Sequence, residues 1–343
     1  MSGLVRRLVP RSVKRRISAE LARRESARLE RHLATLAARG GPIVVGPWMG
    51  EVGFELLYWV PFVAWFSERY SVDPSRLVVL SRGGTASWYA VPPANYRDVL
   101  DHITPEAYKS EHAARVREIG EQKQTRITTF ERELVAGMSA TAGAAGAPLL
   151  HPELMYRLLR PFWWGHLDES WVHQHTRYRR LPLPAEVPGL PDSFVAVKFY
   201  FNDCFPCSDR NRAFARQVVA DLAQEHEVVS LSTGIDLDDH GCDDLGGTRA
   251  LDLVRGTPAA CNLHVQSSIV ARATAFVGTY GGFAYLAPFH GVPSFAYYDD
   301  PNGFSKSHLR MVRSALARLG TPDLLDARSS RDPVAPLRPA VTT

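Results

Sequence analysis

Two series of apolar strand-like runs alternate with helix-like segments in this chain, and a proline-rich stretch separates the two series. Residues 181–191 contain four prolines. Proline resists both helices and central strands because its backbone lacks an N–H, so we expect an extended connector there. Strands that alternate with helices are typical of parallel sheets. The sequence therefore predicts an α/β fold of two Rossmann-like domains facing each other across a cleft, with residues 40–185 on one side and 186–320 on the other.

The individual segments follow from apolar spacing and from the breaks between them. In the first half we expect strands at 43–45 and 76–80 around a glycine-rich turn (46–53) and a helix (54–70), then helical structure over 105–136, a flexible loop at 138–147 and a helix at 151–164. In the second half we expect strands at 194–199, 227–231, 275–277 and 294–297, and helices at 211–224, 266–273, 282–289 and 305–319. Residues 321–343, rich in proline, arginine and serine, are expected to form a flexible tail.

Composition limits the class of protein. The chain has 343 residues, 45% of them hydrophobic and 22% charged, which suits a globular protein with a large core. It contains no apolar run of the length that a membrane span requires, and the start of the sequence lacks the apolar segment of a signal peptide. Four cysteines are too few for a disulfide scaffold and suit a reducing compartment. We therefore expect a cytoplasmic protein.

The first 39 residues form a basic arm. Residues 1–40 contain eleven arginines or lysines and three glutamates, whereas the whole chain has a net charge of only +4. Leucines recur there at helical spacing, listed here as Leu21, Leu29, Leu33 and Leu36, so the segment 1–39 is expected to be a basic amphipathic helix. Such a helix could bind an anionic membrane surface, which would place the protein on the inner face of the membrane. The alternative is a solvated helix that packs its leucines on the body. Nucleic acid is not expected as a partner, because the arm lacks interleaved aromatic residues.

The turn 278–282 is the strongest sign of a ligand. An apolar strand-like run stops there at paired glycines and restarts as a helix-compatible segment, so backbone N–H groups are presented at a helix start. Orphan N–H groups and the positive end of the helix dipole together favour a phosphate. The alternative is a connection whose glycines serve packing alone. The residues assigned to phosphate or nucleotide binding here are Thr279, Tyr280, Gly281, Gly282 and Tyr285.

Lys198 interrupts an apolar strand, which is costly unless its ammonium group reaches water or an anion. It is expected to point from the end of the sheet toward the cleft and to neutralise a diphosphate. Arginines offer bidentate donors to phosphate, although those that follow could equally be solvated side chains. The other donor-side candidates are Asn202, Arg210, Arg212, Gln266 and Ser267, of which Ser267 could instead be a helix cap.

Two carboxylates lie four residues apart near the glycine-rich turn of the first half. Glu55 has a structural explanation, because an acidic residue complements the dipole at a helix start. Glu51 lies in the loop itself and is the favoured general base, since partial desolvation in a cleft would raise the pKa of its carboxyl group. Trp48, Gly50 and Gly53 are assigned to the acceptor side of the site. The alternative bases are Asp203, His290 and His308.

Two groups of residues have the side chains that bind a metal, but each also has a simpler explanation. Cys204, Cys207, His240 and Cys242 have the residue types of a zinc site, but the spacing of the last two is too tight for common structural patterns. The aspartates in 236–244 could bind a divalent ion, but they match no EF-hand register and suit a solvated acidic loop better. We therefore expect neither a metal nor another resident cofactor.

Together these features resemble a GT-B glycosyltransferase, and the stretch 266–293 resembles the donor-site region of bacterial heptosyltransferase-like and fucosyltransferase-like enzymes of surface polysaccharide synthesis. The resemblance implies an inverting, metal-independent transfer of a hexosyl or deoxyhexosyl group from a nucleotide sugar to a glycan, lipid-linked or small-molecule acceptor. It places Glu51 as the acceptor-side base and Lys198 with 279–282 as the diphosphate clamp. The chain departs from the heptosyltransferase pattern at Tyr-Gly-Gly and lacks the arginine pair of the fucosyltransferases.

Two other functions fit the same features. A sugar-nucleotide epimerase uses a similar two-domain architecture and would form its product without an acceptor. A non-catalytic protein could bind a nucleotide sugar or a glycan in the same cleft.

Overall fold

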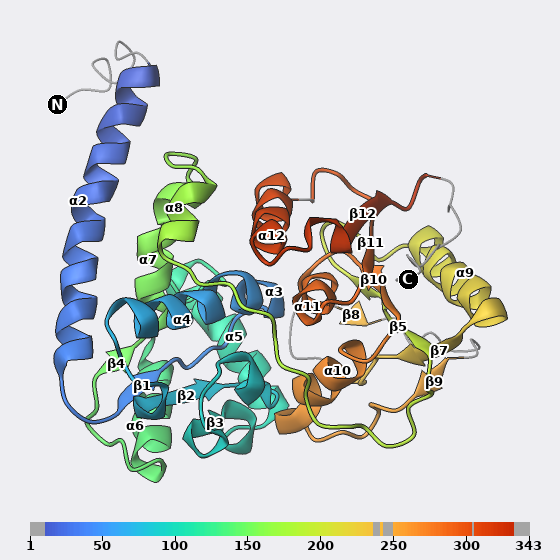
Figure 1. Ribbon diagram of the computed structural model, residues 1–343, viewed down its shortest axis with the longest axis horizontal. Coiled ribbons are helices and arrows are strands. Elements are labelled where there is room, and N and C mark those ends of the chain that lie inside the picture. The colour runs from blue at the N-terminus through green and yellow to red at the C-terminus, as the bar shows by residue number, and fades with distance from the viewer. Residues whose placement is uncertain (1–10, 236–240, 243–249, 304, 333–343) are drawn as a thin grey trace.

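The computed structural model describes residues 11–235, 241–242, 250–303 and 305–332, which form two α/β halves side by side (Figure 1). The first half contains a four-stranded parallel sheet with the strand order β3-β2-β1-β4. Its strands are β1 (Ile43–Val45), β2 (Leu77–Ser81), β3 (Tyr96–Asp98) and β4 (Leu149–Leu150).

The second half is built on a six-stranded parallel sheet with the strand order β12-β11-β10-β5-β7-β9. Numbered by their sequence within this half and read from the β9 edge, the strands run 3-2-1-4-5-6, which is the doubly wound Rossmann order. The strands are β5 (Phe194–Lys198), β7 (Glu227–Ser230), β9 (Leu251–Asp252), β10 (Ala275–Thr279), β11 (Ser294–Tyr298) and β12 (Leu325–Ser329); a separate antiparallel pair joins β6 (Tyr200–Phe201) to β8 (Gly241–Cys242). The predicted α/β class with two parallel sheets is confirmed.

Helices connect the strands and cover both sheets. In the first half they are α2 (Arg11–Ala38), α3 (Val52–Phe54), the π-helical turn η1 (Glu55–Trp59), α4 (Val60–Arg69), α5 (Pro105–Ile119), α6 (Thr129–Thr141), α7 (Pro152–Trp163) and α8 (Glu169–Gln174). In the second half they are α9 (Asp209–Glu225), α10 (Asn262–Val270), α11 (Gly282–His290) and α12 (Lys306–Arg318). Short 3-10 turns lie at 74–76, 85–88, 93–95, 99–101, 259–261 and 322–324.

The alternation of side chains along the strands divides the first half into two apolar layers. Val44, Val78 and Leu80 pack with Tyr108 of α5 and Met138 of α6 on one face of the sheet. The opposite face joins a larger core that includes α4 and α7 and continues into the second half. Because parallel strands are covered by helices on both faces, their sequences are continuously apolar rather than alternating.

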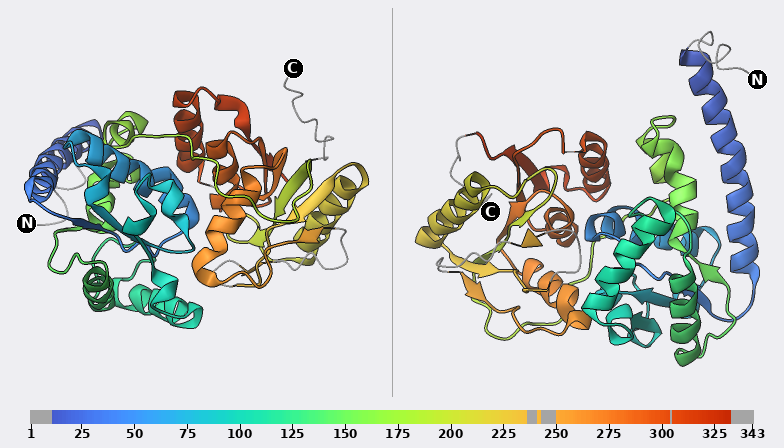
Figure 2. Two further views of the ribbon diagram at one scale, coloured as in Figure 1. Left: turned by 60° about the horizontal axis from the view of Figure 1, so that its bottom comes forward. Right: turned by 180° about the vertical axis from the view of Figure 1, so that it is seen from behind.

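The basic arm is helical over its described part, but its leucines do not share one environment. Leu29, Leu33 and Leu36 are buried, and α2 packs on α7 and β4. Leu21, by contrast, is 60% exposed, so the apolar stripe predicted from the leucine spacing breaks down toward the start of the helix. Figure 1 and the right panel of Figure 2 show that this end of α2 projects beyond the rest of the molecule.

The structure corrects the helical region predicted over 105–136 and the loop predicted at 138–147. Gly120 ends α5 in a left-handed conformation, and a capping box between Thr128 and Glu131 starts α6. The second helix then continues to Thr141, into the expected loop, because alanine and methionine are good helix formers even in a glycine-rich context.

The structure also extends the second sheet beyond the expected boundary at residue 320. Residues 325–329, assigned from sequence to a flexible tail, form the edge strand β12 and pair in parallel with β11. The segment Leu-Asp-Ala-Arg-Ser has little apolar character of its own, so its pairing partner rather than its composition makes it a strand.

The two halves contact each other directly. Helix α3 lies against α11 at the junction (Figure 1). Farther along, the indole N–H of Trp88 donates to Ser267 Oγ over 3.2 Å, and the His264 amide donates to the Gly83 carbonyl over 2.8 Å. Within the described residues, no helix has both the length and the apolar character that crossing a bilayer requires.

Candidate functional site

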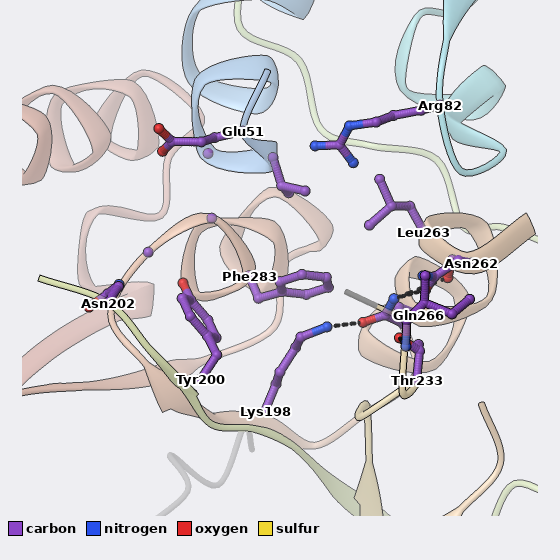
Figure 3. A pocket seen from close by; sticks show the side chains of 15 residues that line it. Glu51, Arg82, Lys198, Tyr200, Asn202, Thr233, Asn262, Leu263, Gln266 and Phe283 are labelled. Atoms are coloured by element: carbon purple, nitrogen blue, oxygen red, sulfur yellow. Dashed lines mark hydrogen bonds between the residues drawn. The ribbon is translucent and has the colours of Figure 1, made fainter. Parts of the chain in front are cut away.

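A pocket that is open to solvent lies between the two halves, where the carboxyl ends of the central strands meet. Both walls contribute charged groups, and Figure 3 shows Glu51 and Arg82 on one side with Lys198 and Gln266 on the other. The lining residues are Glu51, Val52, Gly53, Arg82, Lys198, Tyr200, Asn202, Thr233, Ile235, Asn262, Leu263, Gln266, Gly281, Gly282 and Phe283.

The wall of the second half is built at the point where the strand order reverses. Neighbouring strands β5 and β10 lead to helices on opposite sides of the sheet, which leaves a crevice outside their carboxyl ends. Lys198 is the last residue of β5, and Gly281 follows β10 directly before α11. The start of α11 therefore faces the pocket, with no side-chain cap on its N–H groups.

Steric constraints explain the glycines of this turn. A Cβ atom on Gly281 would lie 2.0 Å from Tyr200 Oη, and one on Gly278 would lie 2.0 Å from the Lys198 carbonyl oxygen. Gly281 also has φ of 155°, which L-residues rarely adopt. The turn thus requires glycine for close packing as well as for its backbone conformation.

Lys198 is held at the base of the pocket. Its Nζ donates to Gln266 Oε1 over 2.5 Å and lies 3.9 Å from the centroid of the Phe283 ring (Figure 3). Gln266 in turn donates to the side chain of Asn262 one helical turn earlier. The residue is only 8% exposed, so its charge lies in a partly desolvated site, where it interacts more strongly with an anion than it would in water.

The opposite wall begins at Glu51, which precedes α3 and is half-buried. The helical run that starts there meets α11 almost backbone to backbone, since a Cβ on Gly282 would lie 2.6 Å from the Gly53 amide nitrogen. Two helix starts therefore converge on one pocket, one from each half. Their dipoles both favour a negative charge between them.

Two buried side chains hold the loop that leads to Glu51. The Gln124 side chain accepts from the Met49 amide (2.9 Å) and donates to the Pro47 carbonyl (2.8 Å). Arg82 donates to the Gly50 carbonyl over 2.5 Å. The backbone on both sides of Met49 is thus fixed in the residues directly before Glu51.

Gln124 is itself anchored by a buried ion pair. It donates to Glu131 Oε1 over 2.6 Å, and the same oxygen accepts from Arg115 over 3.0 Å. The pKa of Glu131 is lowered to about 2, because hydrogen bonds and charge from His151 and Arg115 outweigh the cost of burial. The carboxylate therefore stays ionised at neutral pH and can accept from both partners.

A cluster of rings and one cation flanks the start of this helix. Lys123 Nζ lies 4.4 Å from the Phe54 ring centroid and 5.8 Å from that of Trp163. His308 of the second half approaches the same Phe54 ring edge-on at 4.9 Å. Burial lowers the pKa of Lys123, and the charge of Glu51 opposes this shift, so the two ionisable groups interact.

Glu55 has a different environment from Glu51. It is fully buried, does not line the pocket, and accepts at Oε1 from Ser81 (2.7 Å) and Tyr89 (2.5 Å). Burial raises the pKa of Glu55 to about 7, although the nearby Arg82 charge opposes the shift. Of the two predicted carboxylates, only Glu51 is placed where a ligand in the pocket could reach it.

The structure does not bring all predicted residues to the pocket. Lys198, Asn202, Gln266, Gly281, Gly282, Gly53 and Glu51 line it. Trp48, expected on the acceptor side, is instead buried in the core and stacks on Trp59 with 5.9 Å between ring centroids. Gly50 contributes its carbonyl to Arg82 but does not line the pocket.

Several predicted donor-side residues support the pocket from behind or lie away from it. Thr279 fastens β10 to Tyr200 by donating to its carbonyl and accepting from its amide. Tyr280 and Tyr285 are buried and contact each other edge-on, and Ser267 bonds Trp88 and His290 at the junction. The two arginines lie elsewhere: Arg210 is exposed and pairs with Asp299, and Arg212 lies over the ring of Phe201. Both lie in the first turn of α9, and neither lines the pocket.

Sequence reasoning missed Arg82, Tyr200, Thr233, Asn262, Leu263 and Phe283. Arg82 directly follows β2, so a signal was present: a charged residue at the carboxyl end of a parallel strand belongs to the ligand-binding edge of the sheet. The others lie in segments whose direction depends on how the two halves meet.

No cluster of potential metal ligands occurs in the described residues. The zinc and divalent-ion alternatives cannot be judged from them, because residues 236–240 and 243–249 lie outside that part of the chain.

No protein-family model matches the chain, and no curated protein matches it in sequence. Three similar solved structures are glycosyltransferases. TibC, an iron-containing dodecameric glycosyltransferase from enterotoxigenic E. coli, is 13% identical, with 78% of this chain and 61% of TibC covered and a TM-score of 0.41. SnogD from Streptomyces nogalater is 14% identical (85% and 88% covered, TM-score 0.40), and a glycosyl transferase family 9 protein from Veillonella parvula is 12% identical (84% and 85% covered, TM-score 0.41).

Proposed function

We propose that the protein is a glycosyltransferase that moves a sugar from a nucleotide-sugar donor to a hydroxyl group of a glycan, lipid-linked or small-molecule acceptor. One observation carries the proposal: Glu51 and Lys198 line opposite walls of one pocket, which the start of α11 also lines. A carboxylate opposite an anion-binding wall suits a reaction in which a proton is removed on one side and a phosphate leaves on the other.

In the proposed reaction, the acceptor oxygen attacks the anomeric carbon of the donor sugar. The Glu51 carboxylate takes the hydroxyl proton, and the bond between the anomeric carbon and the diphosphate oxygen breaks, with its electron pair leaving on the diphosphate. Lys198 and the Gly281–Gly282 amides stabilise that departing charge. Displacement in a single step inverts the anomeric configuration, and a lysine with a helix start can supply the positive charge that other enzymes take from a metal.

The proposal includes a hexosyl or deoxyhexosyl group as the transferred unit, a role in surface polysaccharide synthesis, and a cytoplasmic location with access to the inner face of the membrane. The features that support the proposal, Lys198 and the start of α11, lie on the donor side of the pocket. The acceptor side is the wall formed by the Glu51 loop, next to Phe54 and Lys123.

The first experiment is a screen of nucleoside diphosphates for thermal stabilisation, because a ligand that binds only the native state raises the melting temperature as its affinity rises. With the best ligand, Lys198→Ala should weaken binding by about tenfold or more, the loss of one charge-assisted contact. The exposed Lys306, outside the pocket, provides the matched control Lys306→Ala. Unchanged affinity in Lys198→Ala would remove that residue from the site.

The second experiment separates transfer from the alternatives. Glu51→Gln should keep nucleoside diphosphate affinity and lose turnover, which a non-catalytic binding protein would not do. An epimerase would convert the nucleotide sugar without any acceptor. Turnover that disappears with a chelator would contradict the metal-independent mechanism.

A further inference from the structure

Two of the large apolar side chains most exposed to solvent lie together at the projecting end of the molecule. Trp164 is 65% exposed and Leu21 is 60% exposed, and both line one groove between α2 and the end of α7. Neither residue lines the pocket between the halves. An apolar pair that is left in water on a surface groove marks a contact site for another surface.

Two arginines and one glutamate, Glu25, line the groove beside this apolar pair. The Arg160 guanidinium lies 5.2 Å from the Trp164 ring centroid, and Arg157 on the same helix lines the groove as well. Arg157 approaches Glu25 and Glu153 at 3.5 Å each, so its charge is partly balanced. On the α2 side, Arg23 is exposed.

Helix α2 continues beyond the groove, and the sequence at its start is basic. An α-helix of 28 residues is about 42 Å long at 1.5 Å per residue. Among its side chains from residue 20 on, the first buried one is Ser26, and the right panel of Figure 2 shows the start of α2 projecting beyond both sheets. Residues 1–19 contain six arginines or lysines and no acidic residue.

We propose that this face, the Leu21–Trp164 groove with Arg157 and Arg160 and the first turns of α2, which are basic in sequence, binds the surface of an anionic membrane. Indole rings favour the boundary between headgroups and acyl chains, since they combine a large apolar ring with an N–H donor. Lysine and arginine are attracted to anionic headgroups within a Debye length of the surface. Apolar insertion and charge attraction together give binding that neither gives alone.

The experiment is co-sedimentation of the full chain with vesicles of phosphatidylglycerol and phosphatidylcholine, compared with phosphatidylcholine alone. We expect binding to the anionic vesicles only, and a decrease as salt is added. Trp164→Ala and Leu21→Ser should each lower partitioning, by about tenfold for the tryptophan, the loss expected when one large apolar side chain no longer inserts.

The chain offers a matched control in Leu183, which is 66% exposed but lies in the connector between the halves and outside the groove. Leu183→Ser should bind anionic vesicles like the unchanged protein. All three substitutions are at exposed positions, so circular dichroism should report the same fold in each.

Equal binding to neutral and anionic vesicles would overturn the proposal, and so would an equal loss in Leu183→Ser and Trp164→Ala. Binding to an acidic protein with no binding to vesicles would assign the face to a different partner and overturn it too. Nucleoside diphosphate binding should be the same in all variants, so these outcomes are independent of the proposed glycosyl transfer.

Discussion

The buried carboxyl group of Glu55 makes a quantitative prediction about stability. Its side chain is fully buried, and its pKa is raised to about 7 from the ordinary value of 4.5, chiefly by burial. Oε1 accepts two hydrogen bonds, but Oε2 has no hydrogen-bond partner among the described residues. The folded protein therefore favours the protonated acid over the carboxylate.

The direction of this pKa shift determines whether the free energy of unfolding rises or falls with pH. Where the folded pKa lies above the unfolded one, the group's stabilising contribution is fully present below the unfolded pKa and is lost as the pH rises through the folded pKa. A shift from 4.5 to about 7 corresponds to about 3 kcal/mol at 1.36 kcal/mol per pH unit. The free energy of unfolding should thus lose about 3 kcal/mol from this group between pH 4 and pH 8.

Glu55→Gln tests this value, because glutamine resembles the protonated acid in shape and does not titrate. Urea denaturation of both proteins at several pH values gives the difference in their free energies of unfolding. That difference should change by about 3 kcal/mol from pH 4 to pH 8, in favour of the variant at the higher pH. Taking the difference removes the other groups that titrate in this range, such as Asp98, whose pKa is raised to about 6 by burial.

Glu227→Gln, at an exposed position, controls for the loss of one carboxylate. Parallel pH profiles for Glu55→Gln and the unchanged protein would refute the reasoning. They would mean that Arg82, which opposes the shift, holds the carboxylate ionised throughout.

Three other substitutions test the architecture of the site. Gln124→Met removes the hydrogen bonds to the Glu51 loop at similar side-chain volume. It should destabilise the protein by about 1–3 kcal/mol for each buried group left unpaired, and it should lower turnover more than nucleoside diphosphate affinity. Turnover equal to that of the unchanged protein would show that the loop keeps its position without the glutamine. Gly281→Ala should cost about 1–3 kcal/mol, because of the clash with Tyr200 Oη and because of the backbone conformation at φ of 155°. Adding Tyr200→Phe should restore part of this loss in thermal melts, since the next ring atom lies 3.2 Å away, and no rescue would place the whole strain in the backbone. Ser267→Ala leaves the Trp88 indole without its acceptor and should cost about 1–3 kcal/mol in denaturation, whereas an unchanged midpoint would mean that this junction does not contribute.

The sequence predicted the central strands well because their signal is local. Strands β1, β5 and β10 are continuous apolar runs, as buried parallel strands must be, and each lies within a residue or two of its expected position. The edge strands β3 and β12 were missed. Tyr96–Asp98 and Leu325–Ser329 are polar, and only pairing with a neighbour makes them strands.

The site residues that could be predicted from sequence are likewise those with a local signal. Gly281, Lys198 and Glu51 were predicted because each is unusual in its local context, as a turn glycine, a charge in a strand or an acid in a glycine loop. Trp48 was misplaced because an aromatic residue in a glycine-rich turn gives no sign of the face it will pack against. Gln124 lies 75 residues from the amide it fixes, so no local pattern could have identified its contact with the loop.

The contact between Gly53 and Gly282 has a consequence for ligand choice. With no side chain on either residue, the two backbones are in direct contact, and their van der Waals radii set the separation of the two walls at this point. A methyl group on either glycine would act as a wedge and tilt one half against the other. The junction therefore fixes the distance between the two walls, so a group that bridges Glu51 and Lys198 must match that distance as long as the contact between the halves is kept.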